Sequence, residues 1–263
     1  MPTLRLAPGS LSGPLVLARS PPRQSWQILP LKLAGFGKQR RGPTPNAAAV
    51  VVFGANGRVG RRCVVGLARR KQQVVAVSRS GNFDSSGLSL SGEELACIVA
   101  KKGDVCDLSS LAETLVGASG AIFVASASKG ASPFDVDRDG AINVARACIS
   151  SRVPRFVLVT SGGVSKPSSP IYKYNNLYGG LMQAKFEGED GTRRLYAAQE
   201  ESVQSDLGYT IIRPGGITDE PQLGVDYLEL SQGESDVLVM LRPRLIAGTA
   251  HGSMCKFEGD FFR

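Results

Sequence analysis

The chain has 263 residues, of which 42% are hydrophobic, so it is long and apolar enough to form one large domain with its own core. The formal net charge is +8, but residues 1–47 hold seven basic residues and no acid. Residues 48–263 therefore have a net charge of only +1, which is eight minus seven. The net charge of the chain is thus no argument for a nucleic-acid-binding surface on the folded part.

Residues 1–47 are rich in serine, proline and glycine as well as free of acids. Leaders of this composition are typical of chloroplast or mitochondrial transit peptides. We therefore predict that residues 1–47 form a disordered transit peptide that is removed; the alternative is a disordered arm that stays attached. No apolar run in the sequence approaches the roughly 18 residues that cross a bilayer, so we expect a soluble or peripheral protein without a transmembrane segment.

The sequence has a single histidine, His251, and five cysteines that stand apart from one another. No two cysteines have the spacing of a zinc site or a redox pair, and one histidine cannot build a multi-histidine site. We therefore expect no metal site and no Ser-His-Asp triad. The cysteines are expected to be small buried hydrophobes in a reducing compartment.

From residue 48 on, short apolar runs alternate with segments whose apolar residues have helical spacing. The run AAVVVF, residues 48–53, suits a strand buried on both faces of a parallel sheet, and further strands are predicted over residues 72–78, 96–101, 121–126, 155–161 and 209–216. Helices are predicted over residues 59–67, after a capping box at Ser110–Glu113, over residues 134–150, and from Leu181 onwards. This alternation predicts an α/β fold: a doubly wound, Rossmann-like parallel sheet in a single domain, residues 48–233.

The strongest motif is GANGRVG, residues 54–60, between the first predicted strand and the first predicted helix. Glycines permit a tight turn and a close approach to a pyrophosphate, and the helix N-terminus offers free N–H groups to the anion. The spacing is GxxGxxG rather than GxGxxG, and the alternative is an ordinary glycine-rich turn. Because a strand precedes the motif and a helix follows it, we assign cofactor binding to Gly54, Asn56, Gly57, Arg58, Val59 and Gly60.

The second predicted strand ends in Val77-Ser78-Arg79, where NAD-specific sites usually place an acid that binds the ribose hydroxyls. Arg79 could instead pair with a 2′-phosphate, and Arg58 could approach the same phosphate. Ser78 and Arg79 therefore predict NADP(H) in preference to NAD(H). The alternative for Arg79 is a solvated loop residue.

The next two strand ends also carry candidate cofactor residues. Asp104 could place a carboxylate near the adenine amino group while Val105 packs on the ring; the alternative is a strand-to-helix turn with Asp107 as a cap. Ala125 and Ser126 are small residues at the end of the fourth strand. In open α/β sheets the ligand binds beyond the carboxyl ends of the strands, where small residues leave room for it.

Together these motifs resemble the atypical short-chain dehydrogenase/reductases over residues 48–233. The resemblance rests on GANGRVG, on GDVCD after the third strand, on VDRDGAINV, FVLVTSGGV and YTIIRPGGITDEP, and on NNLYGGLMQAKFEGED. It is greatest to the NAD(P)-binding, NmrA-like branch found in plant and algal plastids, whose members include reductase-like proteins and photosystem assembly factors. The resemblance implies a chloroplast location, with the mitochondrion as the alternative.

At matching positions the resemblance implies roles for individual residues. Ser161 occupies the serine position at the end of strand five, and Lys185 the position of the active-site lysine, which binds the nicotinamide ribose. Pro214 and Gly215 occupy the turn whose backbone meets the nicotinamide carboxamide. Leu181 stands four residues before Lys185, where the family usually has the tyrosine that protonates a substrate carbonyl.

Leucine has no proton to donate, so the identity of any general acid is open. Tyr178 lies seven residues before Lys185 and would be a full turn too distant, because Gly179 and Gly180 precede the predicted helix. Lys185 could itself be the acid, as in some NADPH reductases of the wider class. We favour Lys185 as a ribose ligand only, and whether the chain is an enzyme stays open.

Residues 234–263 depart from the family pattern. They contain one apolar run, VLVML, and after it the apolar residues have neither helical nor strand-like spacing. We predict a divergent, poorly packed tail and an incomplete substrate lobe. The resulting interpretation is a plastid NADP(H)-binding protein with a regulatory or assembly role, plastid protein partners and little carbonyl reductase activity. The alternative is an NADPH-dependent oxidoreductase of a small carbonyl or enone compound that uses Lys185 and Ser161.

Overall fold

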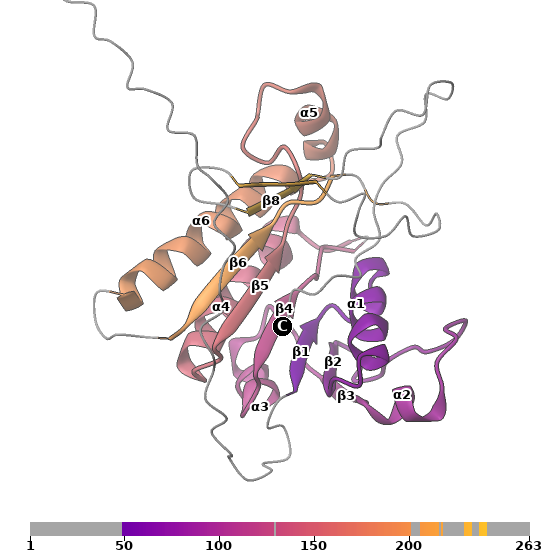
Figure 1. Cartoon of the computed structure of the whole chain (residues 1–263). Coiled ribbons are helices and arrows are strands. Elements are labelled where there is room, and N and C mark those ends of the chain that lie inside the picture. Colours follow the sequence, from indigo (N-terminus) through magenta and orange to yellow (C-terminus); the bar gives the residue numbers. More distant parts are fainter. Residues whose placement is uncertain are drawn as a thin grey trace, which may run out of the picture. The chain divides into compact units, whose positions relative to one another are not determined.

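The computed structural model describes residues 49–128, 130–200, 206–215, 217, 229–232 and 237–240 (Figure 1). The predicted transit peptide, residues 1–47, lies outside these described residues, as does most of the predicted tail, residues 234–263. The proposal that the leader is removed therefore rests on its sequence.

The described strands of the central layer form one parallel sheet in the order β3-β2-β1-β4-β5-β6. They are β1 (Val50–Phe53), β2 (Val74–Ser78), β3 (Ile98–Lys102), β4 (Gly120–Phe123), β5 (Arg155–Val159) and β6 (Gly208–Ile212). The chain extends the sheet from β1 to β3, then returns to build β4 to β6 on the other side of β1. This is the topology of a doubly wound sheet, and it confirms the predicted fold class.

Both faces of the sheet are covered, which explains why β1 is apolar throughout. Val51 and Phe53 pack in a core that includes Val144 of α4 (Ala141–Ser150) and Tyr196 of α6 (Leu181–Glu200). The other two valines of β1, residues 50 and 52, pack in a second core that includes residues of α1 (Arg58–Arg69). Helices α4 and α6 therefore lie on one face and α1 on the other (Figure 1).

The predicted strands all form, and α6 begins at Leu181 as predicted. Gly179 and Gly180 directly before it have φ angles of +65° and +81°, a left-handed conformation that glycine adopts without strain. Two short helices, α2 (Gly92–Ala96) and α5 (Pro170–Asn176), were not predicted. Each is too short for its sequence to show a periodic apolar stripe.

The predicted capping box at Ser110–Glu113 is wrong. Helix α3 (Ala112–Leu115) has no side-chain cap, because Ser110 belongs to the preceding 3₁₀ helix η1 (Leu108–Ser110). The Ser110 hydroxyl instead lies 3.0 and 2.8 Å from the carbonyl oxygens of Asp104 and Asp107, and its one proton is shared between them. A capping box does form at α2, where Ser91 and Glu94 exchange hydrogen bonds with each other's backbone N–H groups.

The predicted helix over residues 134–150 is two helices of different winding. Its first part, η2 (Phe134–Gly140), is a π-helix, and α4 continues from it. Helix α6 packs closely against both, since a Cβ atom added at Gly188 would lie 2.6 Å from the Asp137 carbonyl oxygen. One added at Gly191 would lie 2.5 Å from the Ile142 side chain. The two glycines therefore allow α6 to approach η2 and α4.

Beyond β6, β7 (Glu229–Gln232) pairs in an antiparallel manner with β8 (Val237–Met240). Strand β8 contains most of the apolar run VLVML, and it lies beside β6. No helix in the described part of the chain is long and apolar enough to cross a membrane.

Candidate functional site

The glycine turn joins the end of β1 to the start of α1, and its geometry depends on the absence of side chains. Gly54 has a φ angle of +84°, and a Cβ atom added there would lie 2.7 Å from the backbone of Ala125. A Cβ atom added at Gly60 would lie 2.1 Å from the Gly54 carbonyl oxygen. The turn therefore brings the N-terminus of α1 directly to the end of β1, which fits the pyrophosphate of a dinucleotide.

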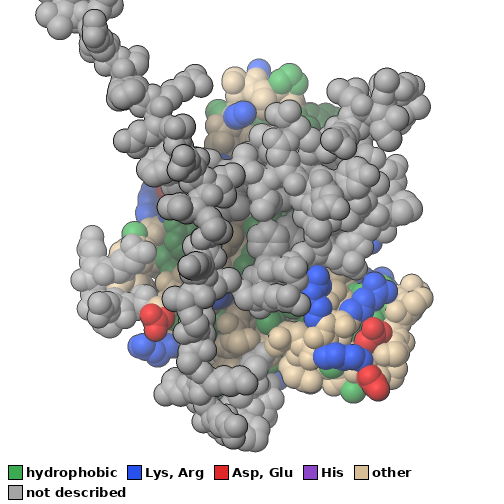
Figure 2. Space-filling view, viewed as in Figure 1, with side chains coloured by type: hydrophobic (Ala, Val, Ile, Leu, Met, Phe, Trp, Pro, Cys, Tyr) green, Lys and Arg blue, Asp and Glu red, His purple; other side chains and the backbone are tan. Residues whose placement is uncertain are grey.

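Helix α1 also has the charge that an anion site requires. Its N-cap is Gly57 in an extended conformation, without a side-chain cap and without an acid in the first turn. Arginines follow at Arg58, Arg61 and Arg62, and Figure 2 shows Lys and Arg side chains gathered over α1. Arg58 is exposed and Val59 half-buried at the start of the helix. Neither the first N–H groups nor the helix dipole is compensated by an acid of the helix itself.

Asn56 fastens this turn to the loop that follows β2. Its Nδ2 donates to the Asn82 carbonyl oxygen at 2.8 Å, and its Oδ1 accepts from the Asp84 backbone N–H at 2.9 Å. Arg61 of α1 lies 3.5 Å from the Asp84 carboxylate. Hydrogen bonds from Ser86, together with the charge of Arg61, lower the pKa of Asp84. Asn82 and Asp84 were not predicted from the sequence, because nothing local marks their pairing with Asn56.

The two residues predicted at the end of β2 make different contacts. The Ser78 hydroxyl donates to the Asn82 carbonyl oxygen at 2.7 Å, so Asn82 joins the strand end to the glycine turn. Arg79 is exposed, and its Nη2 donates to Ser128 Oγ at 3.2 Å. The Arg79 side chain thus extends from the end of β2 towards the loop after β4, across the position where an adenosine ribose is expected.

The end of β3 forms the predicted turn with Asp107 as a cap, since Asp107 Oδ1 accepts from the Ser109 N–H at 3.0 Å. Asp104 Oδ1 accepts from the Cys106 N–H at 3.0 Å. Val105 is buried in the core on the α4 side, close to Gly140, and its carbonyl oxygen accepts from the Asn143 side chain at 3.1 Å. The turn accounts for these contacts, and binding of adenine by Asp104 and Val105 stays a prediction.

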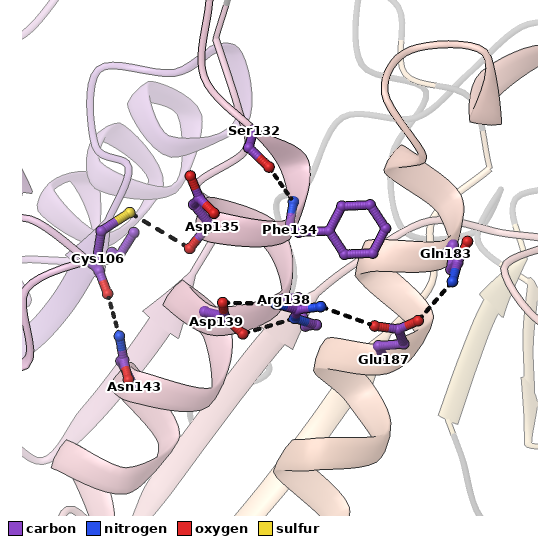
Figure 3. A network of polar contacts seen from close by, with 10 residues as sticks. Cys106, Ser132, Phe134, Asp135, Arg138, Asp139, Asn143, Gln183 and Glu187 are labelled. Atoms are coloured by element: carbon purple, nitrogen blue, oxygen red, sulfur yellow. Dashed lines mark hydrogen bonds and ion pairs between the residues drawn. The ribbon is translucent and has the colours of Figure 1, made fainter.

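The four cysteines in the described part of the chain only partly match the sequence prediction, and Cys255 lies outside it. Cys97 and Cys148 are buried, but Cys106 is exposed and Cys63 is partly exposed. The Cys106 thiol lies within 3.5 Å of the Asp135 carbonyl oxygen of η2 (Figure 3). Partial burial and the nearby Asp104 carboxylate raise the pKa of Cys106.

Among the described residues, no cluster of three or more His, Cys, Asp or Glu side chains could hold a metal ion.

Lys185 of α6 is held by a buried carboxylate that the sequence analysis did not single out. Lys185 Nζ donates to Asp137 Oδ1 at 2.7 Å, and the Asp137 side chain is fully buried. The second Asp137 oxygen accepts from the Ala127 N–H at 2.9 Å. Asp137 therefore joins Lys185 to the loop that follows β4, just beyond Ala125 and Ser126. Asp137 is buried in the π-helix η2, and nothing in the local sequence marks its pairing with Lys185.

A surface network flanks this ion pair and fastens η2 to α6 (Figure 3). Arg138 of η2 pairs with Asp139 at 2.7 Å and with Glu187 of α6 at 3.4 Å. Glu187 also accepts from Gln183 at 2.8 Å. Gln183 and Glu187 lie on either side of Lys185 in the chain, so these contacts restrain the part of α6 that carries the lysine.

The ends of β5 and β6 are joined through their backbones. The Thr160 N–H donates to the Ile212 carbonyl oxygen at 2.9 Å, and the Gly162 N–H donates to the Pro214 carbonyl oxygen at 2.6 Å. Ser161 is half-buried, and its hydroxyl is 3.4 Å from the Gly162 carbonyl oxygen. Pro214 is buried and Gly215 is exposed. The predicted serine and the predicted Pro-Gly turn therefore lie side by side.

The two positions considered for a proton donor near Lys185, 181 and 178, hold a leucine and a surface tyrosine. Leu181 is the first residue of α6 and is half-buried. Tyr178 is 60% exposed, and its hydroxyl lies 3.4 Å from that of Tyr174 on α5, to which it donates a hydrogen bond. This hydrogen bond raises the pKa of Tyr178. Tyr178 thus pairs with α5 at the surface, and Lys185 pairs with Asp137.

Comparison with known proteins agrees with this geometry. A family described as NAD(P)H-binding matches residues 54–238. The chain is 31% identical to protein TIC 62 of Oryza sativa subsp. japonica over 64% of this chain and 35% of that one. It is 28% identical to divinyl chlorophyllide a 8-vinyl-reductase of Oryza sativa subsp. indica over 89% of this chain and 59% of the other. Both relatives are chloroplastic, which agrees with the predicted chloroplast location, and the chain spans less than two thirds of either.

Among solved structures, the oxidoreductase YlbE of Lactococcus lactis is similar in fold, with a TM-score of 0.54 and 24% identity over 70% of this chain and 75% of that one. The family match covers more than half of the sequence and includes the glycine turn, the Asp137–Lys185 pair and the Pro-Gly turn. The chain belongs to the NAD(P)H-binding family, among the atypical short-chain dehydrogenase/reductase-like proteins.

Proposed function

We propose that the chain binds NADP(H) in the chloroplast and has a regulatory or assembly role there, with little carbonyl reductase activity. The observation that carries this proposal is the arrangement around Lys185. Its ammonium group pairs with the buried Asp137 at 2.7 Å, and the position one turn earlier on α6 holds Leu181. The site thus has a cation for binding, but at position 181 it lacks the tyrosine hydroxyl that would protonate a carbonyl oxygen.

Each part of a dinucleotide would meet a different part of the chain. The N–H groups at the start of α1 would bind the pyrophosphate at Gly57 and Arg58. Lys185 has three N–H donors, of which Asp137 accepts one, so the others can bind the hydroxyls of the nicotinamide ribose. The Pro214–Gly215 turn would bind the carboxamide. The cofactor, when bound, supplies a hydride or accepts one.

The preference for NADP(H) over NAD(H) rests on Arg79. A 2′-phosphate offers Arg79 a charge-assisted and bidentate contact, whereas Ser128 accepts a single hydrogen bond at 3.2 Å. On binding, Arg79 would exchange the hydroxyl for the phosphate. Arg58, the first residue of α1 in the turn after β1, would add a second positive charge.

The low reductase activity follows from the chemistry of hydride delivery. Negative charge builds on a carbonyl oxygen during reduction, and a general acid contributes about 10²–10⁴ in rate by protonating it. An acid must come within about 2.6–3.2 Å of that oxygen. Leu181 cannot donate, and Tyr178 is turned to Tyr174 at the surface. Binding does not depend on either residue and is therefore expected to persist.

The relatives fit either of two roles. The vinyl-reductase is an enzyme by its name, whereas protein TIC 62 is not named for a reaction. The alternative to a regulatory role is therefore an NADPH-dependent oxidoreductase in which Ser161 and Lys185 polarise a carbonyl or an enone. In that case an N–H group of Lys185 that is not bonded to Asp137 would donate to the substrate oxygen.

The deciding experiment measures binding and turnover on the same preparation of the full chain. Calorimetric titration with NADPH and NADH is combined with NADPH oxidation in the presence of aldehydes, ketones and enones. We expect saturable NADPH binding and turnover close to the rate without protein. Robust turnover on any of these compounds, lost in Lys185→Ala while NADPH still binds, would establish the oxidoreductase instead.

A further inference from the structure

Helix α6 carries a second buried charge one turn after Lys185. The Glu189 side chain is fully buried, and Arg193 of the same helix donates to its Oε2 at 3.0 Å. A buried carboxylate is unfavourable unless its oxygens accept hydrogen bonds from well-placed partners. The identity of those partners therefore shows what Glu189 holds in place.

The other partners come from the ends of two different strands. Thr160, directly after β5, donates its hydroxyl proton to Glu189 Oε1 at 2.6 Å. Arg213, directly after β6, donates from Nε to the two carboxylate oxygens at 2.9 and 3.1 Å, and from Nη2 to Oε2. One carboxylate thus joins α6 to both strand ends. Thr160 and Arg213 are also close through the backbone hydrogen bond from Thr160 to Ile212.

The residues that follow these partners are the ones expected at the nicotinamide end of the cofactor. Thr160 precedes Ser161, and Arg213 precedes Pro214. Lys185 and Glu189 are four residues apart on α6 and therefore lie on one face of the helix. The Glu189 carboxylate thus fixes the distance between Lys185 on the helix and the two strand ends opposite.

We propose that Glu189 is a positioning residue for the nicotinamide end of the NADP(H) site. It holds Ser161, the Pro214 turn and Lys185 in the arrangement that binds the nicotinamide riboside. This inference rests on the proposed cofactor binding and adds to it a residue that does not itself touch the cofactor. A role in stability alone would make no distinction between the two halves of the cofactor.

The test compares two ligands by calorimetric titration of the full chain. NADPH occupies both ends of the site, whereas adenosine 2′,5′-bisphosphate lacks the nicotinamide half. The test variant is Glu189→Gln, which keeps the size of the side chain but loses the charge and one acceptor. The matched control is Asp190→Asn, because Asp190 is the next residue, 42% exposed and paired with Arg194 at the surface.

For Glu189→Gln we expect the dissociation constant of NADPH to rise about tenfold or more, while that of adenosine 2′,5′-bisphosphate changes less than about twofold. The fluorescence of bound NADPH should also shift towards that of the free cofactor, because it reports the surroundings of the nicotinamide. Asp190→Asn should change neither ligand. Equal weakening of both ligands in Glu189→Gln with the fold intact, or no change in either, would overturn the proposal.

If Glu189→Gln does not fold, Thr160→Val provides the same test. It removes only the 2.6 Å hydrogen bond and leaves both arginines paired with Glu189. We expect a smaller weakening of NADPH alone, and no weakening would refute the positioning role. A wild-type chain that binds adenosine 2′,5′-bisphosphate as tightly as NADPH would refute it as well, but would leave NADP(H) binding in place. A wild-type chain that binds neither ligand would refute both.

Discussion

The turn after β1 and the ends of β5 and β6 lie at the same carboxyl edge of the sheet, but different forces hold them in place. At the glycine turn the close approach of backbone to backbone sets the geometry, since a Cβ atom at Gly60 would lie 2.1 Å from the Gly54 carbonyl oxygen. At the other end, buried ion pairs of Asp137 with Lys185 and of Glu189 with Arg213 set it. The contact of Gly54 with Gly60 is local in the sequence, whereas the two ion pairs join residues 48 and 24 positions apart.

This difference means that the two ends should respond differently to substitution. Loss of a glycine should close the pyrophosphate end to every form of the cofactor. Loss of a buried charge should first cost stability and then disturb the nicotinamide end, because the partner charge is left without compensation. The four predictions below test this contrast between the two ends.

The largest effect is expected for Gly60→Val. A branched side chain has no room beside the Gly54 carbonyl oxygen, so α1 must move away from β1 and the N–H groups of its first turn leave the pyrophosphate position. We expect no saturable binding of either NADPH or adenosine 2′,5′-bisphosphate in a titration. Gly87→Val is the control, because a Cβ atom there meets nothing within 4 Å, although its φ of +70° will cost some stability. Normal binding by Gly60→Val would show that the turn does not hold the phosphates.

The second prediction concerns the stability of the nicotinamide end. Asp137→Ala leaves Lys185, whose side chain is 11% exposed, without its carboxylate partner, and we expect the free energy of unfolding to fall by about 3–5 kcal/mol. Urea unfolding followed by circular dichroism measures this change. The control is Asp139→Ala, since Asp139 is 47% exposed in its pair with Arg138 and its loss should cost at most about 1 kcal/mol. The double variant Asp137→Ala with Lys185→Met should recover much of the lost stability; if it does not, the ion pair is not the cause.

Sequence reasoning was accurate where one short segment determines the structure. The strands, the glycine turn and the start of α6 at Leu181 follow from runs of a few residues. It failed where the contact partner is distant, as for Asn56 with Asp84 and for Lys185 with Asp137, 28 and 48 positions apart. The winding of η2 is a further case, because the sequence over residues 134–150 predicts one continuous α-helix rather than a π-helix followed by an α-helix. Ser110 satisfied the capping-box pattern, but its hydroxyl closes the turn after β3.

The third prediction sharpens the contrast at the adenosine ribose. Arg79→Ala removes the charge-assisted contact with a 2′-phosphate, which contributes about 1.5–3 kcal/mol, or roughly tenfold to hundredfold in affinity. We expect NADPH affinity to fall by this factor and NADH affinity to stay nearly constant in parallel titrations. Arg69→Ala is the control, since Arg69 lies at the far end of α1. Equal affinities of the wild-type chain for NADPH and NADH would remove the basis for an NADP(H) preference.

The smallest effect is expected for Leu181→Tyr, although it restores the Tyr-x-x-x-Lys spacing. A phenol at this position is a more effective acid when the ammonium group of Lys185 lies beside it and lowers its pKa, and that group is bonded to Asp137 at 2.7 Å. We expect unchanged NADPH binding and a rise in carbonyl turnover of less than about tenfold, well short of the full contribution of a general acid. Leu181→Phe is the matched control, because it adds the same ring without the hydroxyl.

Combining Leu181→Tyr with Asp137→Asn should give a larger rise in turnover, since the second substitution weakens the ion pair that restrains Lys185. A large gain from Leu181→Tyr alone would mean that the missing phenol was the sole barrier to reduction, and that the buried pair does not restrain the lysine.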